Sequence, residues 1–167
     1  MSKLVITLLA ALVSLGIANA QLKVGVINSQ KAILETEDIK KAQVDLTAKY
    51  KPRQDQLEKL QKELQDIQSQ LQSGKLNQLG EQELTAQGQK KQRDLQRLQQ
   101  DLQEDADRDR NDILQRAGAR MQEVVKKLAD EKGLDLVVDS ANTLFFKPAL
   151  ELTTDAVAAY NKAYPVK

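Results

Sequence analysis

The sequence predicts an α+β protein that is predominantly α-helical, in which a long antiparallel coiled-coil hairpin is inserted into a small β body. Apolar residues recur at alternating steps of three and four from Leu57 to Leu71, which is the narrow seam of a coiled coil. Strand-like segments flank this helical stretch on both sides. Aromatic residues make up 3% of the chain, and Trp is absent, so little of it can form a globular core.

The first 20 residues have the features of a signal peptide. Lys3 makes the start positive, residues 4–17 are mostly apolar, and residues 18–20 read Ala-Asn-Ala, which predicts cleavage after Ala20. The apolar run is shorter than the roughly 20 residues that span a bilayer. The alternative is an uncleaved membrane anchor, but no stop-transfer pattern follows. We therefore expect export, which leaves a mature chain with 24 basic and 24 acidic residues.

The mature chain is expected to open with part of the body, residues 21–35. Residues 22–28 alternate like a strand, and Asn28 can cap a short helix through Leu34. The predicted arm, residues 36–132, begins at Thr36, a hydroxyl cap followed by two carboxylates that suit the positive end of a helix.

The arm is predicted to turn back near residues 72–82, because Ser73, Gly74 and Gly80 interrupt the helical pattern. Glu81 or Glu83 is expected to open the return helix, which carries an apolar stripe to Leu128. Gly133 is its expected C-cap. At 1.5 Å per residue, such a hairpin extends on the order of 55–75 Å.

The second part of the body, residues 133–167, is expected to hold two more strands, at 134–139 and 143–147, and a final helix capped at 153–155. Three short strands leave open edges and a marginal core, so we expect a homo-oligomer. The candidate residues for its core are Leu22, Val24, Val26, Leu134, Leu136, Val138 and Phe145.

Several segments together resemble the Skp/OmpH family of periplasmic chaperones. They are KVGVINSQKAI at 23–33, the Gln-rich hairpin, GLDLVVDSAN at 133–142 and ELTTDAVAAYNK at 151–162. The last is similar to the family's D-I-T-x-x-V ending, with Glu151 in place of Asp and Leu152 in place of Ile. The resemblance covers residues 21–167, and its strength lies in the order of the elements.

The resemblance implies a periplasmic homotrimer whose three tentacle-like arms surround a cavity. Members hold unfolded outer-membrane β-barrel proteins there without ATP, which prevents aggregation. No ATP-binding loop or cofactor motif occurs in this sequence, so we expect no cofactor. Family members are basic, which suits lipopolysaccharide, whereas this mature chain is neutral, so the resemblance does not extend to tight lipopolysaccharide binding, and the sequence leaves such binding open.

Candidate client-binding residues gather near the predicted tip. A basic group on the return helix could contact acidic client segments or a membrane surface, or it could pair with Glu58, Glu63 and Asp66 of the facing helix. Nearby leucines could contact clients or close the turn. These candidates are Lys75, Leu76, Leu79, Leu84, Lys90, Lys91, Arg93 and Arg97.

Three residues are candidate hinges that would let the arm flex around clients of different size. Pro52 removes a hydrogen bond inside the ascending helix and should bend it. Gly88 and Gly118 weaken the return helix by about 1 kcal/mol each relative to Ala. For Gly118 the alternative is close helix packing near the body.

Other function classes fit the composition poorly. The chain has no His and no Cys, which removes the usual zinc sites, thiol chemistry and His-based triads. The paired carboxylates lie on solvated helix faces, so we expect no enzyme, and a neutral chain without stacking aromatics indicates no nucleic-acid partner. The remaining alternative is a structural coiled-coil adaptor or spacer of the cell envelope.

Overall fold

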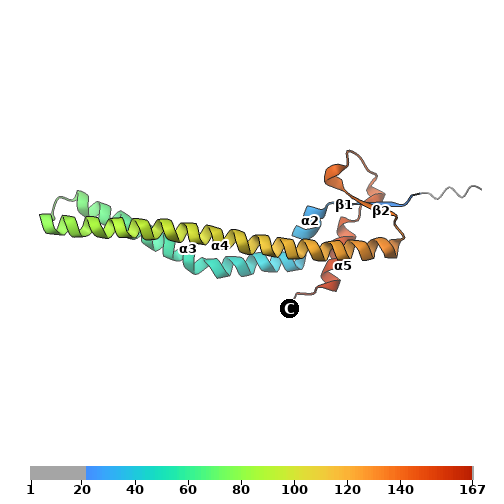
Figure 1. Cartoon of the computed structure of the whole chain (residues 1–167), viewed down its shortest axis with the longest axis horizontal. Coiled ribbons are helices and arrows are strands. Elements are labelled where there is room, and N and C mark those ends of the chain that lie inside the picture. Colours follow the sequence, from blue (N-terminus) through green and yellow to red (C-terminus); the bar gives the residue numbers. More distant parts are fainter. Residues whose placement is uncertain (1–21, 167) are drawn as a thin grey trace, which may run out of the picture.

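A computed structural model describes residues 22–166; the predicted signal peptide and its cleavage after Ala20 lie outside these residues. Two long helices lie side by side as an arm, and the remaining elements form a small body at one end (Figure 1). The elements are β1 (Val24–Ile27), α2 (Ser29–Leu34), α3 (Glu37–Gln72), α4 (Gln78–Lys132), β2 (Leu136–Asp139), two 3-10 turns (Ser140–Asn142 and Pro148–Leu150) and α5 (Thr153–Ala163).

Helix α3 begins where the sequence predicts. The hydroxyl oxygen of Thr36 accepts from the backbone N–H of Ile39 at 3.3 Å, and Asn161 of α5 accepts from the N–H of Glu37 at 3.0 Å. Two of the unpaired N–H groups at the helix start are thus satisfied, one of them by the body. Helix α3 continues through Pro52 without interruption.

The turn at the tip of the arm is shorter than predicted. Helix α3 ends at Gln72, Gly74 adopts a left-handed conformation with φ 66°, and α4 already starts at Gln78. The prediction of a start at Glu81 or Glu83 is wrong because the side chain of Asn77 caps α4, accepting from the N–H of Gly80 at 2.8 Å. At its other end, α4 stops at Gly133, whose left-handed φ of 59° confirms the predicted C-cap.

The strands β1 and β2 pair in parallel, with Val24 opposite Leu136 and Val26 opposite Val138. A parallel pair requires a long crossover, and the whole arm serves as this connection. The other edge of β1 is occupied by the chain before α5, since the N–H of Leu152 donates to the carbonyl of Val26 at 2.8 Å.

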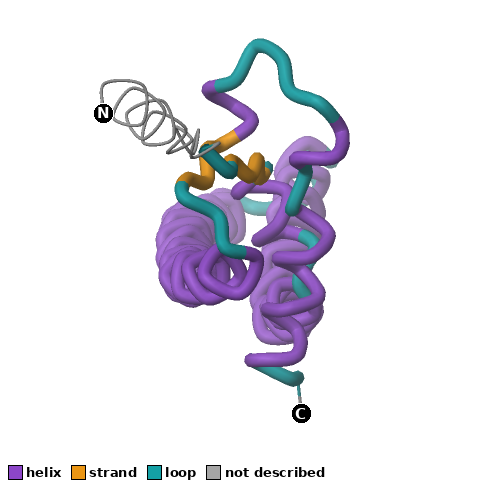
Figure 2. The backbone as a smooth tube through the Cα atoms, turned by 90° about the vertical axis from the view of Figure 1, so that its right-hand side faces the viewer, coloured by secondary structure: helices purple, strands orange, loops and turns teal. Residues whose placement is uncertain are grey.

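The predicted third strand at 143–147 is wrong. This segment is an irregular loop between the two 3-10 turns, and Figure 2 shows it as an arch that stands away from the strands. A strand needs a partner for its backbone groups, but this segment pairs with neither strand. Strand β1 lies between β2 and residues 151–152, and among residues 22–166 no strand pairs with the outer edge of β2. Leu144 is fully exposed and Phe145 is 82% exposed.

The body core forms where α4 and α5 pack against α2 and β1. Its buried residues are Ile27, Ala32, Met121, Val124, Leu128, Ala156 and Tyr160. The last turns of α4, which the sequence assigned to the arm, are therefore part of the body. Of the predicted core residues, Val26 is buried, whereas Val24, Leu134 and Val138 are half-buried. Leu22, Leu136 and Phe145 are exposed, so their expected burial does not occur within a single chain.

Candidate functional site

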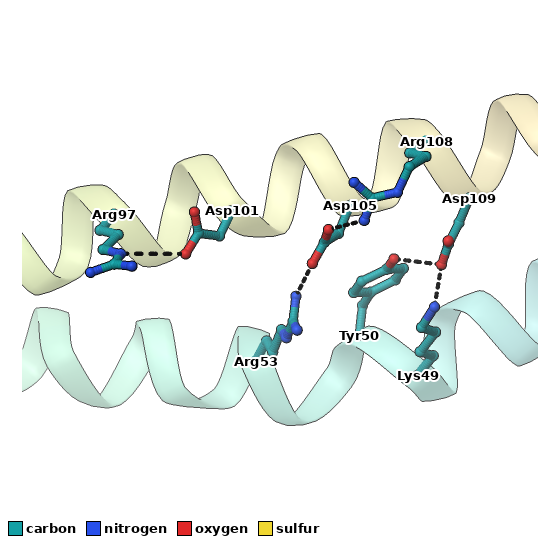
Figure 3. A network of polar contacts seen from close by, with 8 residues as sticks. All are labelled: Lys49, Tyr50, Arg53, Arg97, Asp101, Asp105, Arg108 and Asp109. Atoms are coloured by element: carbon teal, nitrogen blue, oxygen red, sulfur yellow. Dashed lines mark hydrogen bonds and ion pairs between the residues drawn. The ribbon is translucent and has the colours of Figure 1, made fainter.

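The middle of the arm is held together by ion pairs between its helices (Figure 3). Asp109 of α4 accepts from the ammonium of Lys49 and, at 2.6 Å, from the hydroxyl of Tyr50. Asp105 accepts from Arg53 of α3 at 2.6 Å and from Arg108 of its own helix. The carboxylates of Asp105 and Asp109 are thus paired with basic and phenolic groups of α3. These pairs could not be identified from the sequence, because they depend on the register of the two helices.

These contacts shift the acid–base equilibria of the arm. Hydrogen bonding from Lys49, and next from Tyr50, lowers the pKa of Asp109. Hydrogen bonding from Arg53, and next from Arg108, lowers the pKa of Asp105. Both carboxylates therefore favour their charged form, which keeps the pairs intact at neutral pH.

The basic residues near the tip divide into paired and unpaired groups. Lys91 is half-buried and its ammonium lies 2.5 Å from Glu63, which lowers the pKa of that carboxyl. Arg97 reaches Asp101 of its own helix at 3.8 Å. Within residues 22–166, Lys75, Lys90 and Arg93 are exposed and make no ion pair, while neither Glu58 nor Asp66 pairs across the arm.

The three leucines near the tip differ in their surroundings. Leu76 is half-buried, and its side chain lies over Gly80 in the first turn of α4. Leu84 is also half-buried, whereas Leu79 is 63% exposed. Closing the turn therefore accounts for Leu76, and Leu79 is the one that presents most apolar surface to solvent.

The base of the arm is joined to the body through Asp38, in the first turn of α3. Its carboxylate accepts from Arg120 of α4 at 2.8 Å and from the hydroxyl of Tyr160 of α5 at 2.9 Å. The guanidinium of Arg120 also lies 4.7 Å from the ring centroid of Tyr164. One carboxylate thus connects three helices.

Comparison with known protein families identifies the family that has this architecture. The model of the OmpH-like outer membrane protein family matches residues 23–160, which include both strands, the entire arm and most of α5. The chain belongs to this OmpH-like family. The match spans the body as well as the arm, so it does not depend on the coiled coil alone.

Two individual proteins resemble this OmpH-like chain along its length. A Skp-like protein of Pseudomonas aeruginosa is 24% identical over 155 residues, which are 92% of each chain. A crystal structure of an OmpH-like chain from Caulobacter crescentus, described as an outer membrane chaperone, superposes with a TM-score of 0.75. That structure shares 17% identity and covers 90% of both chains, so it shows a common fold.

The hinge candidates of this OmpH-like chain lie in different packing environments. Pro52 is exposed within the continuous α3. A Cβ atom on Gly88 would lie 3.2 Å from Cγ2 of Ile67, so Gly88 permits close approach of α3 and α4. A Cβ atom on Gly118 would lie 3.8 Å from Cδ1 of Ile33, an ordinary contact. Bending at any of the three stays a prediction.

Among residues 22–166 of this OmpH-like chain, no group of three or more acidic residues could hold a metal ion. Within the same range no helix is both long enough and apolar enough to cross a membrane.

Proposed function

We propose that this OmpH-like chain is an ATP-independent holdase chaperone of the periplasm, which binds unfolded outer-membrane proteins between helical arms. One observation carries the proposal: most side chains of a long two-helix arm are exposed, and the arm projects from the body without covering any other part of the chain. Such an arm offers a large accessible surface. Family membership, and the description of the Caulobacter relative as an outer membrane chaperone, support this use of it.

Release without ATP requires contacts that are individually weak. The unpaired basic groups Lys75, Lys90 and Arg93 and the exposed Leu79 are side chains of this kind. Several arms around one client raise the effective concentration of such contacts, so that a client is retained although each contact exchanges rapidly. We assign the tip residues this role, with a membrane surface as a further partner of the basic ones.

We also propose that the chain assembles through its body as a homotrimer. Leu144 is fully exposed, Phe145 is 82% exposed and Leu22 is 62% exposed, and all three belong to the small body. Three large apolar side chains exposed on one small body indicate a surface that another chain covers. The number three comes from the family resemblance, and the exposed body residues support self-association.

Aggregation of a denatured outer-membrane β-barrel protein, diluted into buffer without nucleotide, tests the proposal. Light scattering is recorded with and without the mature chain, and the mass of the complex is measured in parallel. Suppression of scattering near one trimer per client is the expected result. If a folded helical oligomer fails to suppress scattering even in large excess, the holdase proposal is wrong for this client class. Stoichiometric binding of a folded envelope protein would then favour the adaptor.

A further inference from the structure

The two sides of the proximal arm differ sharply in charge. Three hollows flank the contact between α3 and α4, and Leu46 lines all of them. On one side lies a hollow of about 620 Å³, and seven of its twelve lining residues are charged. On the other side lie two hollows of about 460 and 320 Å³, which share Leu46 and Thr47. Arg110 is the one charged residue that lines either of these two.

The helical geometry places the two sides apart. Asp45 and Lys49 line the charged hollow, whereas Thr47 lines the two neutral ones. A step of two residues turns the side chain by about 200° around a helix, which brings it to the opposite side. The two neutral hollows share Leu46 and Thr47 and follow one another along the arm, so we treat them as one groove. Ala42, Leu46 and Ile113 lie on its border with the charged hollow, because they line both. We call this neutral groove the amide groove, after its Gln-rich wall.

The amide groove combines an apolar floor with neutral hydrogen-bonding walls. Leu46, Leu57 and Leu102 contribute to its floor. Gln54, Gln99 and Gln103 line its wall, and each of their amides can both donate and accept a hydrogen bond. The amide of Gln103 already donates to Asp107 at 2.7 Å, which leaves its second N–H and its oxygen. An extended polypeptide has unpaired N–H and C=O groups along its edges, so such walls can satisfy it in any register.

The dimensions of the groove also suit an extended chain. The α3 residues that line its two hollows are centred roughly seven residues apart, on the order of 10 Å of helix. An extended polypeptide covers that distance in about three to four residues. Strands of outer-membrane barrels have about ten residues that alternate between apolar and polar. One such segment can therefore place apolar side chains in both hollows and keep its backbone against the amides.

We propose that the amide groove binds extended, weakly charged segments of the client polypeptide, and that this side of the arm faces the cavity. The inference rests on the proposed holdase function and names where on the arm the client lies. The near absence of charge in the groove favours apolar client segments, since a charged side chain would lose its hydration and, away from Arg110, would gain no partner. The charged side stays solvated.

The matched pair Gln54 and Gln56 tests the assignment. Both are exposed glutamines of α3, but Gln54 lines the groove, whereas Gln56 lies about 200° around the helix from it. Since the chain has no Cys, Gln54→Cys and Gln56→Cys each accept one polarity-sensitive fluorophore at a unique position. An unfolded outer-membrane β-barrel protein is then added to the full oligomer. We expect the emission to shift to the blue at position 54 and to stay nearly unchanged at position 56.

The outcomes separate this inference from the function on which it rests. Equal shifts at the two positions, with aggregation still suppressed, would overturn the groove alone. A label at 54 that is already shielded before client is added would mean that another arm occupies the groove, which also overturns the inference. If the unlabelled wild-type chain fails to suppress client aggregation, both the holdase function and the groove are wrong.

A second pair of variants tests whether client binding requires the amide groove to be uncharged. Gln54→Glu places a charge in the groove, whereas Gln56→Glu adds the same charge on the other side of the helix. Because the new carboxylate has to be desolvated by an apolar segment, we expect Gln54→Glu to weaken client binding by about threefold or more. Gln56→Glu should bind like the wild type. Equal affinities of the two variants, both folded by circular dichroism, would contradict the inference.

Discussion

The hydroxyl of Tyr160 donates a hydrogen bond to Asp38 across 2.9 Å, which joins the last helix of the body to the first turn of the arm. Tyr160 has no exposed surface, and its burial raises the pKa of the phenol. Asp38 also accepts from Arg120 at 2.8 Å. The arm is thus anchored by a polar contact at the edge of the apolar core, where a specific geometry is required.

Removing only this hydroxyl should weaken the junction. Tyr160→Phe keeps the ring in the core but leaves Arg120 as the remaining donor to Asp38. We therefore expect the free energy of unfolding to fall by about 1–2 kcal/mol. Tyr160→Ala also empties the ring site and should cost about 3–5 kcal/mol. Urea denaturation followed by circular dichroism measures both. A Tyr160→Phe variant as stable as the wild type would show that the hydrogen bond adds nothing.

Stability of the arm should fall in acid. The pKa of Asp109 is lowered by hydrogen bonds from Lys49 and Tyr50, and that of Asp105 by hydrogen bonds from Arg53 and Arg108. A carboxyl with a depressed pKa in the folded state stabilises it above the unfolded value, which is about 3.9 for Asp. This stabilisation is lost as the pH falls through the lower folded values.

Thermal melts of the helical signal between pH 7 and pH 2 measure this loss. The midpoint of Asp109→Asn should be lower than that of the wild type at neutral pH, and the two should converge toward the acid end of the range, as the pH falls through the lowered folded pKa of Asp109. The matched control is Asp94→Asn, because Asp94 is exposed and has no ion pair among residues 22–166. A constant difference between Asp109→Asn and the wild type at every pH would argue against titration of this pair.

The arm could be predicted from the sequence because its signals are local. The seam from Leu57 to Leu71 and the caps at Thr36 and Gly133 depend on neighbouring residues, and the structure has them where expected. The pairing of Lys49 with Asp109 joins residues 60 positions apart. This pairing depends on the length of the tip turn. The turn is shorter than predicted, because α4 starts at Gln78 and not at Glu81 or Glu83.

The body was harder to predict for a related reason. Residues 143–147 have β-branched and aromatic side chains typical of a strand, but strand formation requires a free partner edge. In the structure Leu152 takes the second edge of β1, and residues 143–147 arch away without pairing with β2. The amide groove was also missed, because it requires residues of α3 and α4 to meet at one level, and spacing along one helix does not reveal this.

The two arm glycines should respond differently to the same substitution. Gly118→Ala adds a methyl group at 3.8 Å from Ile33, where it fits, so the gain in helix propensity should stabilise the chain by about 0.5–1 kcal/mol. Gly88→Ala places its methyl 3.2 Å from Cγ2 of Ile67, so the Ile67 side chain must give way by a few tenths of an ångström and much of the gain should be lost. Thermal unfolding of the two variants gives the comparison. If Gly118 is a hinge, Gly118→Ala should additionally reduce the spread of the arms, which small-angle scattering measures.

Charge reversal at the tip separates client contacts from structural pairs. Lys90→Glu with Arg93→Glu changes two exposed residues without ion pairs in the described chain, so the fold should persist while binding of acidic client segments weakens. Lys91→Glu instead places a second carboxylate beside Glu63 and should destabilise the arm. Client affinity and the melting temperature are measured for both. Unchanged affinity of the double variant would remove these residues from the binding surface.

The last prediction concerns the exposed loop of the body. Burying a side chain of the size of Leu or Phe contributes about 1.5–3 kcal/mol, so covering Leu144 and Phe145 in an oligomer gains about 3–6 kcal/mol per chain. Leu144→Ser with Phe145→Ser should therefore lower the mass in solution to that of the single chain at micromolar concentration. Light scattering coupled to size-exclusion chromatography measures it.

The control for this variant is Leu79→Ser, which removes an exposed leucine at the tip and should leave the mass unchanged. The loop variant should retain its helical signal, since neither side chain packs in the core of the single chain. An oligomer that persists after the double substitution would place the interface elsewhere on the body. If the oligomer is lost while the hairpin stays folded, client binding should also weaken. A single arm offers fewer simultaneous contacts, and binding without ATP is proposed to depend on several weak contacts at once.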